Sequence, residues 1–258
     1  MEGMNLVPID KILEDSEFKR VSLILCYPHP TESETFSRIE ELRTLGVEAL
    51  IFRGRTNIFG VPVLGKGHVG VVVAALYRGR ELALKIRRVD ADRENMRREA
   101  EMLRKANDVS VGPKILSHTD NFLLMELVEG KNLWEWLREP KEAERVRRVL
   151  WELMGQCRRL DEEGIDHGEL SRAHRHVVVT PSEQVRIIDF ETASTSRRAS
   201  NMTSIAHYLF FNKENSEVIQ RILGEIDTEE LQSKLGRYKR NPTEENFKEI
   251  LRHTRLET

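Results

Sequence analysis

The stretch LGKGHVGVVVAALYRGRELALKI, residues 64–86, places three glycines, a β-branched run, a turn and a lysine in a fixed order. Gly65, Gly67 and Gly70 form the pattern G-x-G-x-x-G. In a dinucleotide-binding fold this pattern opens a helix, whereas here a β-branched run and the turn YRGREL follow it. The sequence therefore predicts a glycine-rich loop and a β-hairpin, the arrangement in which backbone approaches phosphate groups closely. A simple hairpin turn without a ligand is the alternative.

Two charged residues downstream of the glycines are predicted to pair. Lys85 ends the second strand of the hairpin, and Glu99 lies at the edge of a helical face formed by Met96, Ala100 and Leu103. A carboxylate beside a buried stripe requires a cationic partner, and Lys85 is the candidate. This would give the lysine–glutamate pair that positions ATP. The alternatives are an exposed strand lysine and an ordinary glutamate at the helix rim.

Three further stretches carry candidate site residues. The segment LLMELVEG, residues 123–130, could present the backbone of Glu126 and Val128 to an adenine edge, although a plain core strand explains it equally. Asp189 follows the apolar run VRII directly, a position that suits a Mg²⁺ ligand or a turn aspartate. The loop GIDHGELSRAHRHVVV, residues 164–179, lies before that run.

The order of these motifs resembles the protein-kinase-like fold over about residues 60–210. The HGxLS form of the loop resembles the RIO-type atypical kinases and related archaeal predicted serine/threonine kinases. The resemblance implies that the three glycines cover the phosphates of ATP and that Lys85 contacts those phosphates. It also implies a bilobal α+β fold and the following roles: Met125 lining the back of the adenine pocket, the backbones of Glu126 and Val128 forming the hinge, and Asp189 binding Mg²⁺.

The loop departs from the family pattern at two positions. Glu169 stands where the catalytic aspartate is expected, and its extra methylene moves the carboxylate by about 1 Å, a displacement that can lower a rate by ~10²-fold. The asparagine that holds a second metal is replaced by His174 or by His176, depending on how the loop is counted. Either histidine could ligate a metal, although imidazole matches Mg²⁺ poorly. The surrounding arginines could instead grip phosphate oxygens, or the loop could simply be solvated.

The segment after Asp189 is short and lacks an A-P-E motif. Glu191 replaces the glycine of D-F-G. In TSRRASNMTS, residues 195–204, Arg197 and Arg198 lie near Ser200 and could bind an anionic substrate or flank a phosphosite. The alternative is a solvated turn that caps the next helix at Asn201 or Thr203.

The pattern of apolar residues predicts three regions: an N-terminal α/β extension over 1–55, a β-rich kinase N-lobe over 56–129 and a short helical C-lobe over 130–258. Within the extension we expect a strand at RVSLILCY (20–27), a helix capped by the box TESE (31–34) with Phe36 on its apolar face, and a strand at VEALIFRG (47–54). A further helix is expected from Asp90 or Asp92 to Ala106, and later helices begin at Thr228 and Thr243.

Composition limits the function classes. The 258 residues are 39% hydrophobic and 33% charged with a net charge of −2, so there is no basic excess that indicates nucleic-acid binding. The two cysteines, Cys26 and Cys157, are expected in the core. The sequence shows neither a signal pattern nor an apolar run of the ~20 residues that span a bilayer, so we expect a cytoplasmic protein without a membrane partner.

The function expected from these features is that of an ATP- and Mg²⁺-dependent atypical serine/threonine protein kinase. Its catalytic residues would be Lys85, Glu169 and Asp189, and its protein substrate is unknown. Two alternatives remain: an ATP-binding pseudokinase or RIO-like ATPase switch acting on a partner, and a small-molecule phosphotransferase. The short C-terminal region disfavours the last, because that class builds a larger helical pocket.

Overall fold

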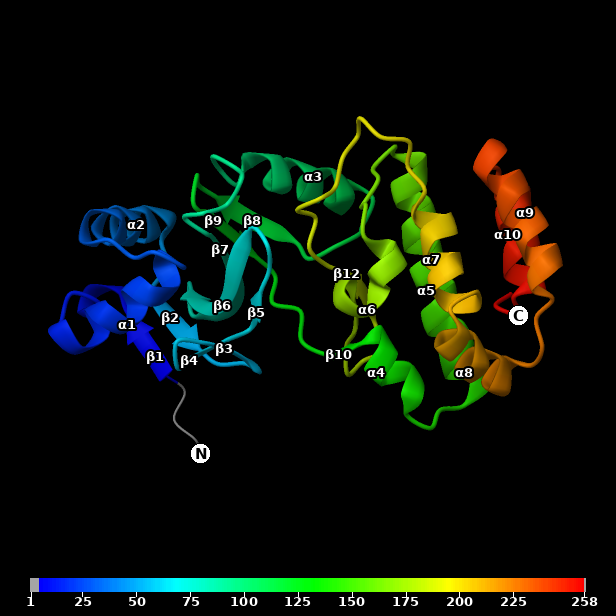
Figure 1. The fold of residues 1–258 in the computed structure, drawn as a ribbon, viewed down its shortest axis with the longest axis horizontal. Coiled ribbons are helices and arrows are strands. Elements are labelled where there is room, and N and C mark those ends of the chain that lie inside the picture. Colours follow the sequence, from blue (N-terminus) through cyan, green and yellow to red (C-terminus); the bar gives the residue numbers. More distant parts are fainter. Residues whose placement is uncertain (1–4, 258) are drawn as a thin grey trace. The chain divides into compact units, whose positions relative to one another are not determined.

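The structure is a computed structural model that describes residues 5–257, and Figure 1 shows its ribbon. Within the described residues the chain divides into two units, one formed by residues 5–101 and 114–127 and the other by residues 102–113 and 128–257. Residues 1–4 of the predicted extension lie outside the described part. The architecture is mixed, with a β-rich first unit and a helical second unit, in agreement with the α+β class expected from the sequence.

An antiparallel sheet forms the centre of the first unit. Its strand order is β1-β2-β6-β7-β9-β8, and β5 also pairs with β6. The predicted β-hairpin is confirmed: a turn at Arg78 and Gly79, both with positive φ (50° and 70°), joins β6 to β7. A separate hairpin consists of β3 and β4. The strands are β1 Asn5–Pro8, β2 Ala49–Phe52, β3 Thr56–Ile58, β4 Val61–Val63, β5 Gly65–Lys66, β6 Gly70–Tyr77, β7 Arg80–Arg87, β8 Ile115–His118 and β9 Phe122–Met125.

The N-terminal extension corrects one expectation. The predicted strand RVSLILCY is wrong, because Arg20–Leu25 form the last part of helix α1 (Asp15–Leu25). Val21, Ile24 and Leu25 follow helical spacing, and all three side chains are fully buried on one face of this helix. The short 3-10 helix η1 (Ile9–Lys11) precedes it. These apolar residues share a core with α2 and the sheet.

Helix α2 (Glu32–Leu45) begins as the sequence indicates. The hydroxyl of Thr31 accepts from the amide of Glu34 at 3.3 Å, and Gly46 ends the helix in the left-handed region with φ 81°. Phe36, however, is 49% exposed and does not belong to the buried face. It packs against Phe18 of α1 with the ring centroids 5.2 Å apart.

Helix α3 (Arg97–Asp108) starts later than predicted. The carboxylate of Asp90 does not cap it; instead both oxygens accept from the guanidinium of Arg88, at 2.8 and 2.7 Å. The predicted apolar face is confirmed, since Met96, Ala100 and Leu103 are buried.

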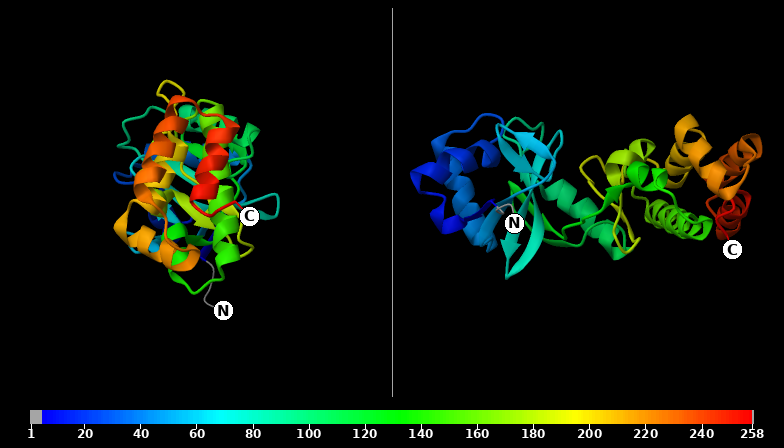
Figure 2. Two further views of the ribbon diagram at one scale, coloured as in Figure 1. Left: turned by 90° about the vertical axis from the view of Figure 1, so that its right-hand side faces the viewer. Right: turned by 90° about the horizontal axis from the view of Figure 1, so that it is seen from below.

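The second unit is built around α5, whose stripe of apolar residues at helical spacing is buried. Helix α5 packs against α7, and α9 and α10 lie side by side (Figure 2). A small sheet of order β10-β11-β12 completes the unit. Its elements are β10 Lys131–Asn132, α4 Leu133–Arg138, α5 Ala143–Glu162, η2 Leu170–Arg172, α6 Ala173–His176, β11 Val177–Val179, β12 Val185–Ile187, α7 Asn201–Phe210, α8 Lys213–Leu223, α9 Thr228–Arg240 and α10 Glu244–His253.

Three helix starts test the predicted caps. Thr243 caps α10 as expected, accepting from the amide of Asn246 at 3.3 Å. Helix α9 is capped by Asp227 rather than Thr228, because the Asp227 carboxylate accepts from two amides of the first turn. The start of α7 is capped from outside: Asp161 of α5 accepts from the amides of Asn201 and Met202, so neither Asn201 nor Thr203 serves as the cap.

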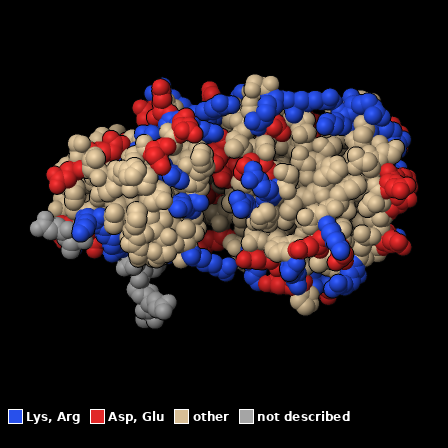
Figure 3. Space-filling view, viewed as in Figure 1, with Lys and Arg blue, Asp and Glu red and all other residues tan. Residues whose placement is uncertain are grey.

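Both cysteines are free and fully buried, as predicted, and burial raises the pKa of each thiol. Charged side chains of both signs are interspersed over the face in Figure 3. Among residues 5–257, no helix is long and apolar enough to cross a membrane.

Candidate functional site

The glycine-rich loop is tight at one end and open at the other. The amide of Gly67 donates to the carbonyl of Gly70 at 2.8 Å. A Cβ at Gly70 would lie 2.9 Å from the carbonyl oxygen of Ile86 and 3.0 Å from Cγ of Lys85, so only glycine fits beside this lysine. A Cβ at Gly65 would meet no atom within 4 Å. The two glycines therefore have different roles. Gly70 allows the loop to pack closely against β7 beside Lys85, and Gly65 leaves space next to the backbone for a ligand.

Tyr27, from the N-terminal extension, contacts this loop. The ammonium group of Lys66 donates to the Tyr27 hydroxyl at 3.1 Å. Lys66 and Arg88 both lie over the Tyr27 ring, at 5.2 and 5.1 Å from its centroid, and Arg88 also donates to the carbonyl of Gly67 at 3.2 Å. Sequence reasoning missed this contact, because no local pattern links residue 27 to residues 66 and 88. The extension thus holds the glycine-rich loop from one side.

Lys85 and Glu99 form the predicted pair inside the first unit. The Nζ of Lys85 lies 2.8 Å from Oε1 of Glu99, and each residue is only 3% exposed. Lys85 sits on β7 opposite Val72 and Leu123. Two opposite charges at this depth interact strongly, and each one needs the other to offset its lost hydration.

The residues predicted for the hinge lie where the chain leaves the first unit. Met125 ends β9, opposite Ala83. Glu126 follows it, with its amide donating to the Lys114 carbonyl at 2.8 Å. Val128 is the first residue of the second unit on this side of the chain. The contact of these residues with adenine stays a prediction.

Glu169 is held by two neighbours in the second unit. Its Oε2 lies 2.8 Å from Nε2 of His176, and its Oε1 accepts from the guanidinium of Arg172 at 2.7 Å. The Arg172 side chain is 56% exposed, and an exposed ion pair of this kind contributes only about 0–1 kcal/mol. The exposed arginine therefore adds little stability to this position of the carboxylate, and the other contact of the carboxylate is with a buried histidine.

The structure distinguishes the two histidines that the sequence left open. His176 is 4% exposed, and its Nδ1 lies 3.9 Å from Oδ2 of Asp189. Neither ring nitrogen has a well-aligned hydrogen-bond partner within residues 5–257. His174 is exposed and stacks on Tyr208 with the ring centroids 6.2 Å apart. His176, and not His174, is thus brought together with Glu169 and Asp189.

Asp189 adopts an unusual backbone conformation. Its φ is +67°, a left-handed value for a non-glycine residue, which costs of order 1–3 kcal/mol and is typical of functional sites. The next residue, Phe190, is buried. Glu191 is not among the residues with positive φ, so the glycine expected at that position is not required here.

The donor set suits Mg²⁺ held mainly by Asp189. The described part of the chain contains no group of three or more His, Cys, Asp or Glu residues that could hold a metal, so Asp189, His174 and His176 form no closed metal cage. Mg²⁺ is commonly bound by one or two carboxylates together with phosphate oxygens. The Asp189 carboxylate therefore fits a single Mg²⁺ whose other ligands would include the phosphate oxygens of a nucleotide.

His167 anchors the loop and was missed by sequence reasoning. It is fully buried, its Nε2 lies 3.1 Å from the carbonyl oxygen of Ile188, and its ring meets that of Phe190 edge-on at 5.0 Å. Burial lowers the pKa of His167 to about 4, so the ring is neutral and its Nε2 donates to the carbonyl. The HG dipeptide of the loop is the only local signal for this role.

The segment that follows Asp189 fixes the same loop. The hydroxyl of Thr192 donates to the carbonyl of His167 at 2.8 Å, and the His167 amide donates to Oδ1 of Asn201 at 2.8 Å. Asp166 and Ser194 exchange two backbone hydrogen bonds of 2.9 Å. Glu169 therefore extends from a loop whose backbone is held on both sides.

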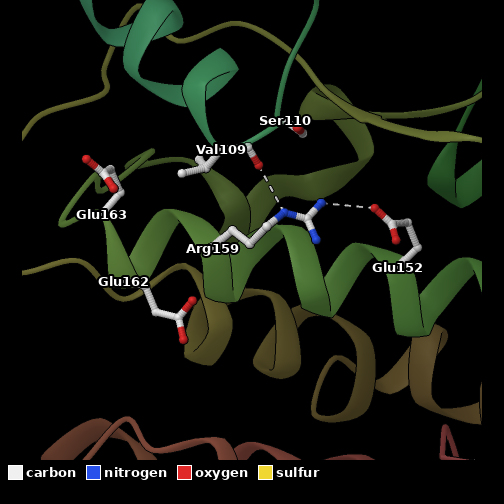
Figure 4. A pocket seen from close by; sticks show the side chains of 6 residues that line it. All are labelled: Val109, Ser110, Glu152, Arg159, Glu162 and Glu163. Atoms are coloured by element: carbon white, nitrogen blue, oxygen red, sulfur yellow. Dashed lines mark hydrogen bonds and ion pairs between the residues drawn. The ribbon is translucent and has the colours of Figure 1, made fainter.

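A pocket of about 660 Å³ on the second unit does not belong to this site (Figure 4). Its central side chain, Arg159, donates to the carbonyl of Val109 at 3.0 Å and to Glu152 at 3.1 Å. The remaining lining carboxylates are Glu162 and Glu163. None of the predicted site residues lines the pocket, and its arginine is already satisfied.

Comparison with known proteins places this geometry in a family. A search of curated proteins found no match. Residues 73–205, just over half of the 258-residue chain, match the family model of the RIO domain. This match includes Lys85, Glu99, Glu169 and Asp189, and members of the family generally bind ATP with Mg²⁺. The chain therefore belongs to the RIO-domain family of atypical kinase- and ATPase-like proteins.

Proposed function

We propose that this protein is an ATP- and Mg²⁺-dependent atypical protein kinase that transfers the γ-phosphoryl group of ATP to a serine or threonine hydroxyl. The observation that carries the proposal is the grouping of Glu169, His176 and Asp189, with contacts of 2.8 and 3.9 Å through the buried histidine. A carboxylate that accepts a proton and a carboxylate that binds a metal are the two acidic groups this reaction requires.

The residues of the first unit would bind the nucleotide. Lys85, fixed by Glu99, would contact the phosphates as a point charge of defined position. The accessible backbone at Gly65 would approach the phosphate oxygens. Met125, Glu126 and Val128 would face the adenine. These roles are supported by the buried lysine–glutamate pair and by the open space at Gly65.

The residues of the second unit would handle the metal and the acceptor. Asp189 would hold Mg²⁺, which when bound neutralises charge on the phosphate oxygens. Glu169 would orient the acceptor hydroxyl and take its proton. His176 would keep the longer glutamate arm in place. Because phosphoryl transfer depends mainly on positioning, a fixed glutamate can substitute for an aspartate.

One observation favours ATP hydrolysis as the second candidate. Oε1 of Glu169 is engaged by Arg172 at 2.7 Å, which leaves less of the carboxylate for a bulky protein acceptor than for water. In that case the protein would be a RIO-like ATPase switch. The same Lys85, Glu169 and Asp189 would act, with water replacing the hydroxyl.

The test compares the purified full-length protein with Asp189→Asn and Lys85→Met, using ATP labelled at the γ-phosphate. Label on the protein itself or on a generic protein substrate, together with its loss in both variants, supports the kinase. Free labelled phosphate without labelled protein supports the ATPase. If the wild type binds ATP with Mg²⁺ but releases no phosphate and labels no protein, the enzymatic proposal is wrong.

A further inference from the structure

A second pocket in the second unit carries features that the proposed reaction does not use. Its volume is about 320 Å³, and it is formed by the segment after Asp189, the start of α7 and the end of α9. The residues that line it include Arg197, Arg198, Ser200, Thr203, Tyr238 and Lys239. None of them belongs to the candidate catalytic residues.

The charge of this pocket is not balanced. Arg197 is neutralised by Asp166, whose Oδ2 accepts from its Nε at 2.9 Å. Arg198 donates to the carbonyl of Lys239, which supplies a hydrogen bond but no charge. Within residues 5–257, neither Arg198 nor the ammonium group of Lys239 makes an ion pair with a carboxylate. Lys and Arg side chains also gather along the upper right-hand edge of the second unit in Figure 3.

The one carboxylate that lines the pocket is committed elsewhere. Asp161 accepts from the amide and side chain of Asn201, at 2.7 and 2.9 Å, and from the amide of Met202, at 3.1 Å. These bonds turn it towards the first turn of α7. A single carboxylate that is engaged in these bonds does not balance both Arg198 and Lys239.

Tyr238 supplies an independent indication of a ligand. This lining residue is 2% exposed, and its buried hydroxyl has no hydrogen-bond partner within the described residues. Burial of a hydroxyl without a partner is unfavourable. Ser200 and Thr203 line the same pocket, and the Thr203 hydroxyl already donates to the carbonyl of Ser200 at 3.0 Å. A ligand with several acceptor atoms would use the hydroxyls of Tyr238 and Ser200 together with the two cations.

We propose that this pocket binds a phosphate group. Arginine, lysine and hydroxyl donors that come from separate segments suit a tetrahedral anion with several oxygens better than a planar carboxylate, which one arginine binds through two parallel hydrogen bonds. The phosphate group could belong to a phosphorylated serine or threonine side chain of a protein, or could be inorganic phosphate. The proposal does not depend on catalysis by Glu169 or Asp189.

The test uses ¹⁵N-labelled full-length protein, titrated separately with inorganic phosphate and with a short phosphoserine peptide. Amide signals of residues 195–203 and 238–241 should shift in a saturable way. Lys239→Ala should weaken binding by about tenfold, as expected for one charge-assisted hydrogen bond. Tyr238→Phe should also weaken binding while the melting temperature is unchanged or higher, because this variant removes only the unsatisfied hydroxyl. Arg240→Ala, the exposed neighbour on α9 that does not line the pocket, should bind like the wild type.

The two probes identify the source of the phosphate. Tighter binding of the peptide indicates a phosphorylated protein side chain, and equal binding indicates free phosphate; both outcomes support the pocket. The proposal is overturned if the shifts occur at residues 65–70 instead, if neither probe binds, or if Lys239→Ala and Tyr238→Phe bind as tightly as Arg240→Ala. Failure of this test leaves ATP turnover unaffected, so it is distinguishable from failure of the proposed kinase function.

Discussion

Nε2 of His176 lies 2.8 Å from Oε2 of Glu169. The family resemblance leads us to expect an aspartate in the place of Glu169, and an asparagine in the place of His174 or His176. Because the two side chains are in contact, the carboxylate of the longer Glu169 side chain lies against the buried ring of His176. The two replacements are thus physically coupled rather than independent losses.

This coupling predicts non-additive kinetics. Glu169→Asp withdraws the carboxylate from the histidine, and His176→Asn removes the ring that holds it. Each single change should lower kcat by about 10²-fold, the effect of a misplacement of about 1 Å. The double variant, which restores the aspartate–asparagine pair, should lose clearly less than the product of the two single effects. Simple multiplication of the two losses would contradict the coupling.

The buried pair of Lys85 and Glu99 predicts a specific pattern of stability. Lys85→Met leaves the Glu99 carboxylate buried, and such a change lowers the free energy of unfolding by about 3–5 kcal/mol. Lys85→Met combined with Glu99→Leu should recover much of this loss, because the buried carboxylate is removed together with the lysine. Urea unfolding measures both values.

A surface pair in the same unit serves as the control for that experiment. Arg53 and Glu81 form an ion pair with side chains about one-third exposed, at 30% and 32%. Arg53→Met should cost no more than about 1 kcal/mol. Equal losses in Lys85→Met and Arg53→Met would show that burial of the Lys85–Glu99 pair has no energetic consequence.

The glycine-rich loop offers a matched pair of substitutions. Gly70→Ala places a Cβ 2.9 Å from the Ile86 carbonyl oxygen and should lower the free energy of unfolding by about 1–3 kcal/mol. Gly65→Ala meets no atom within 4 Å, so stability should hardly change. Its Kd for ATP, measured by calorimetry, should nevertheless rise, because the added methyl group keeps the phosphates away from the backbone. An unchanged Kd would exclude Gly65 from the nucleotide site.

Acid should affect stability through two buried groups with opposite signs. The pKa of His167 is lowered from 6.5 to about 4, so between these values the unfolded chain binds a proton that the folded chain does not. Stability therefore falls as the pH drops from 6.5 to 4, by up to about 1.4 kcal/mol per pH unit. The pKa of Asp161 is raised from 3.8 to about 6, so here the folded chain binds the extra proton and stability rises as the pH drops from 6 to 3.8.

Two variants separate these contributions. Asp161→Asn removes the stabilising protonation, so its free energy of unfolding should fall more steeply with acid than that of the wild type. His167→Gln removes the destabilising protonation, so its curve should be flatter or should slope the other way. Urea unfolding at several pH values between 4 and 7 gives the curves. Parallel curves for all three proteins would refute these assignments.

Much of the fold and part of the site could be predicted from local patterns. The hairpin from Gly70 to Arg87 is signalled by its turn and its β-branched run, and the stripe of α5 is signalled by helical periodicity. The predicted start of α3 was wrong, because Asp90 pairs with Arg88 and does not cap the helix. No local sequence pattern reveals this pair. The strand predicted at RVSLILCY was wrong, because a short apolar run fits a helix as well as a strand.

The remaining site features depend on contacts between distant segments. The pairing of Lys85 with Glu99 follows from their positions on a strand and a helix, and the structure shows it. The choice of His176 over His174 depends on the short helix α6, which sets the direction of each ring. The roles of Tyr27 and Asn201 depend on partners far along the chain, Lys66 for one and Asp161 for the other. Such contacts are not encoded in any spacing.

The central claim is that Glu169 acts as the catalytic carboxylate of a phosphoryl-transfer site. Its most direct test is the single-turnover rate of γ-phosphate loss from bound ATP, measured with Mg²⁺ for the wild type and for Glu169→Gln, a variant that preserves size and removes the charge. We predict that Glu169→Gln binds ATP with a Kd close to that of the wild type and loses about 10²-fold or more in rate, within the range attributed to general acid–base catalysis. A Glu169→Gln rate equal to that of the wild type would contradict the claim.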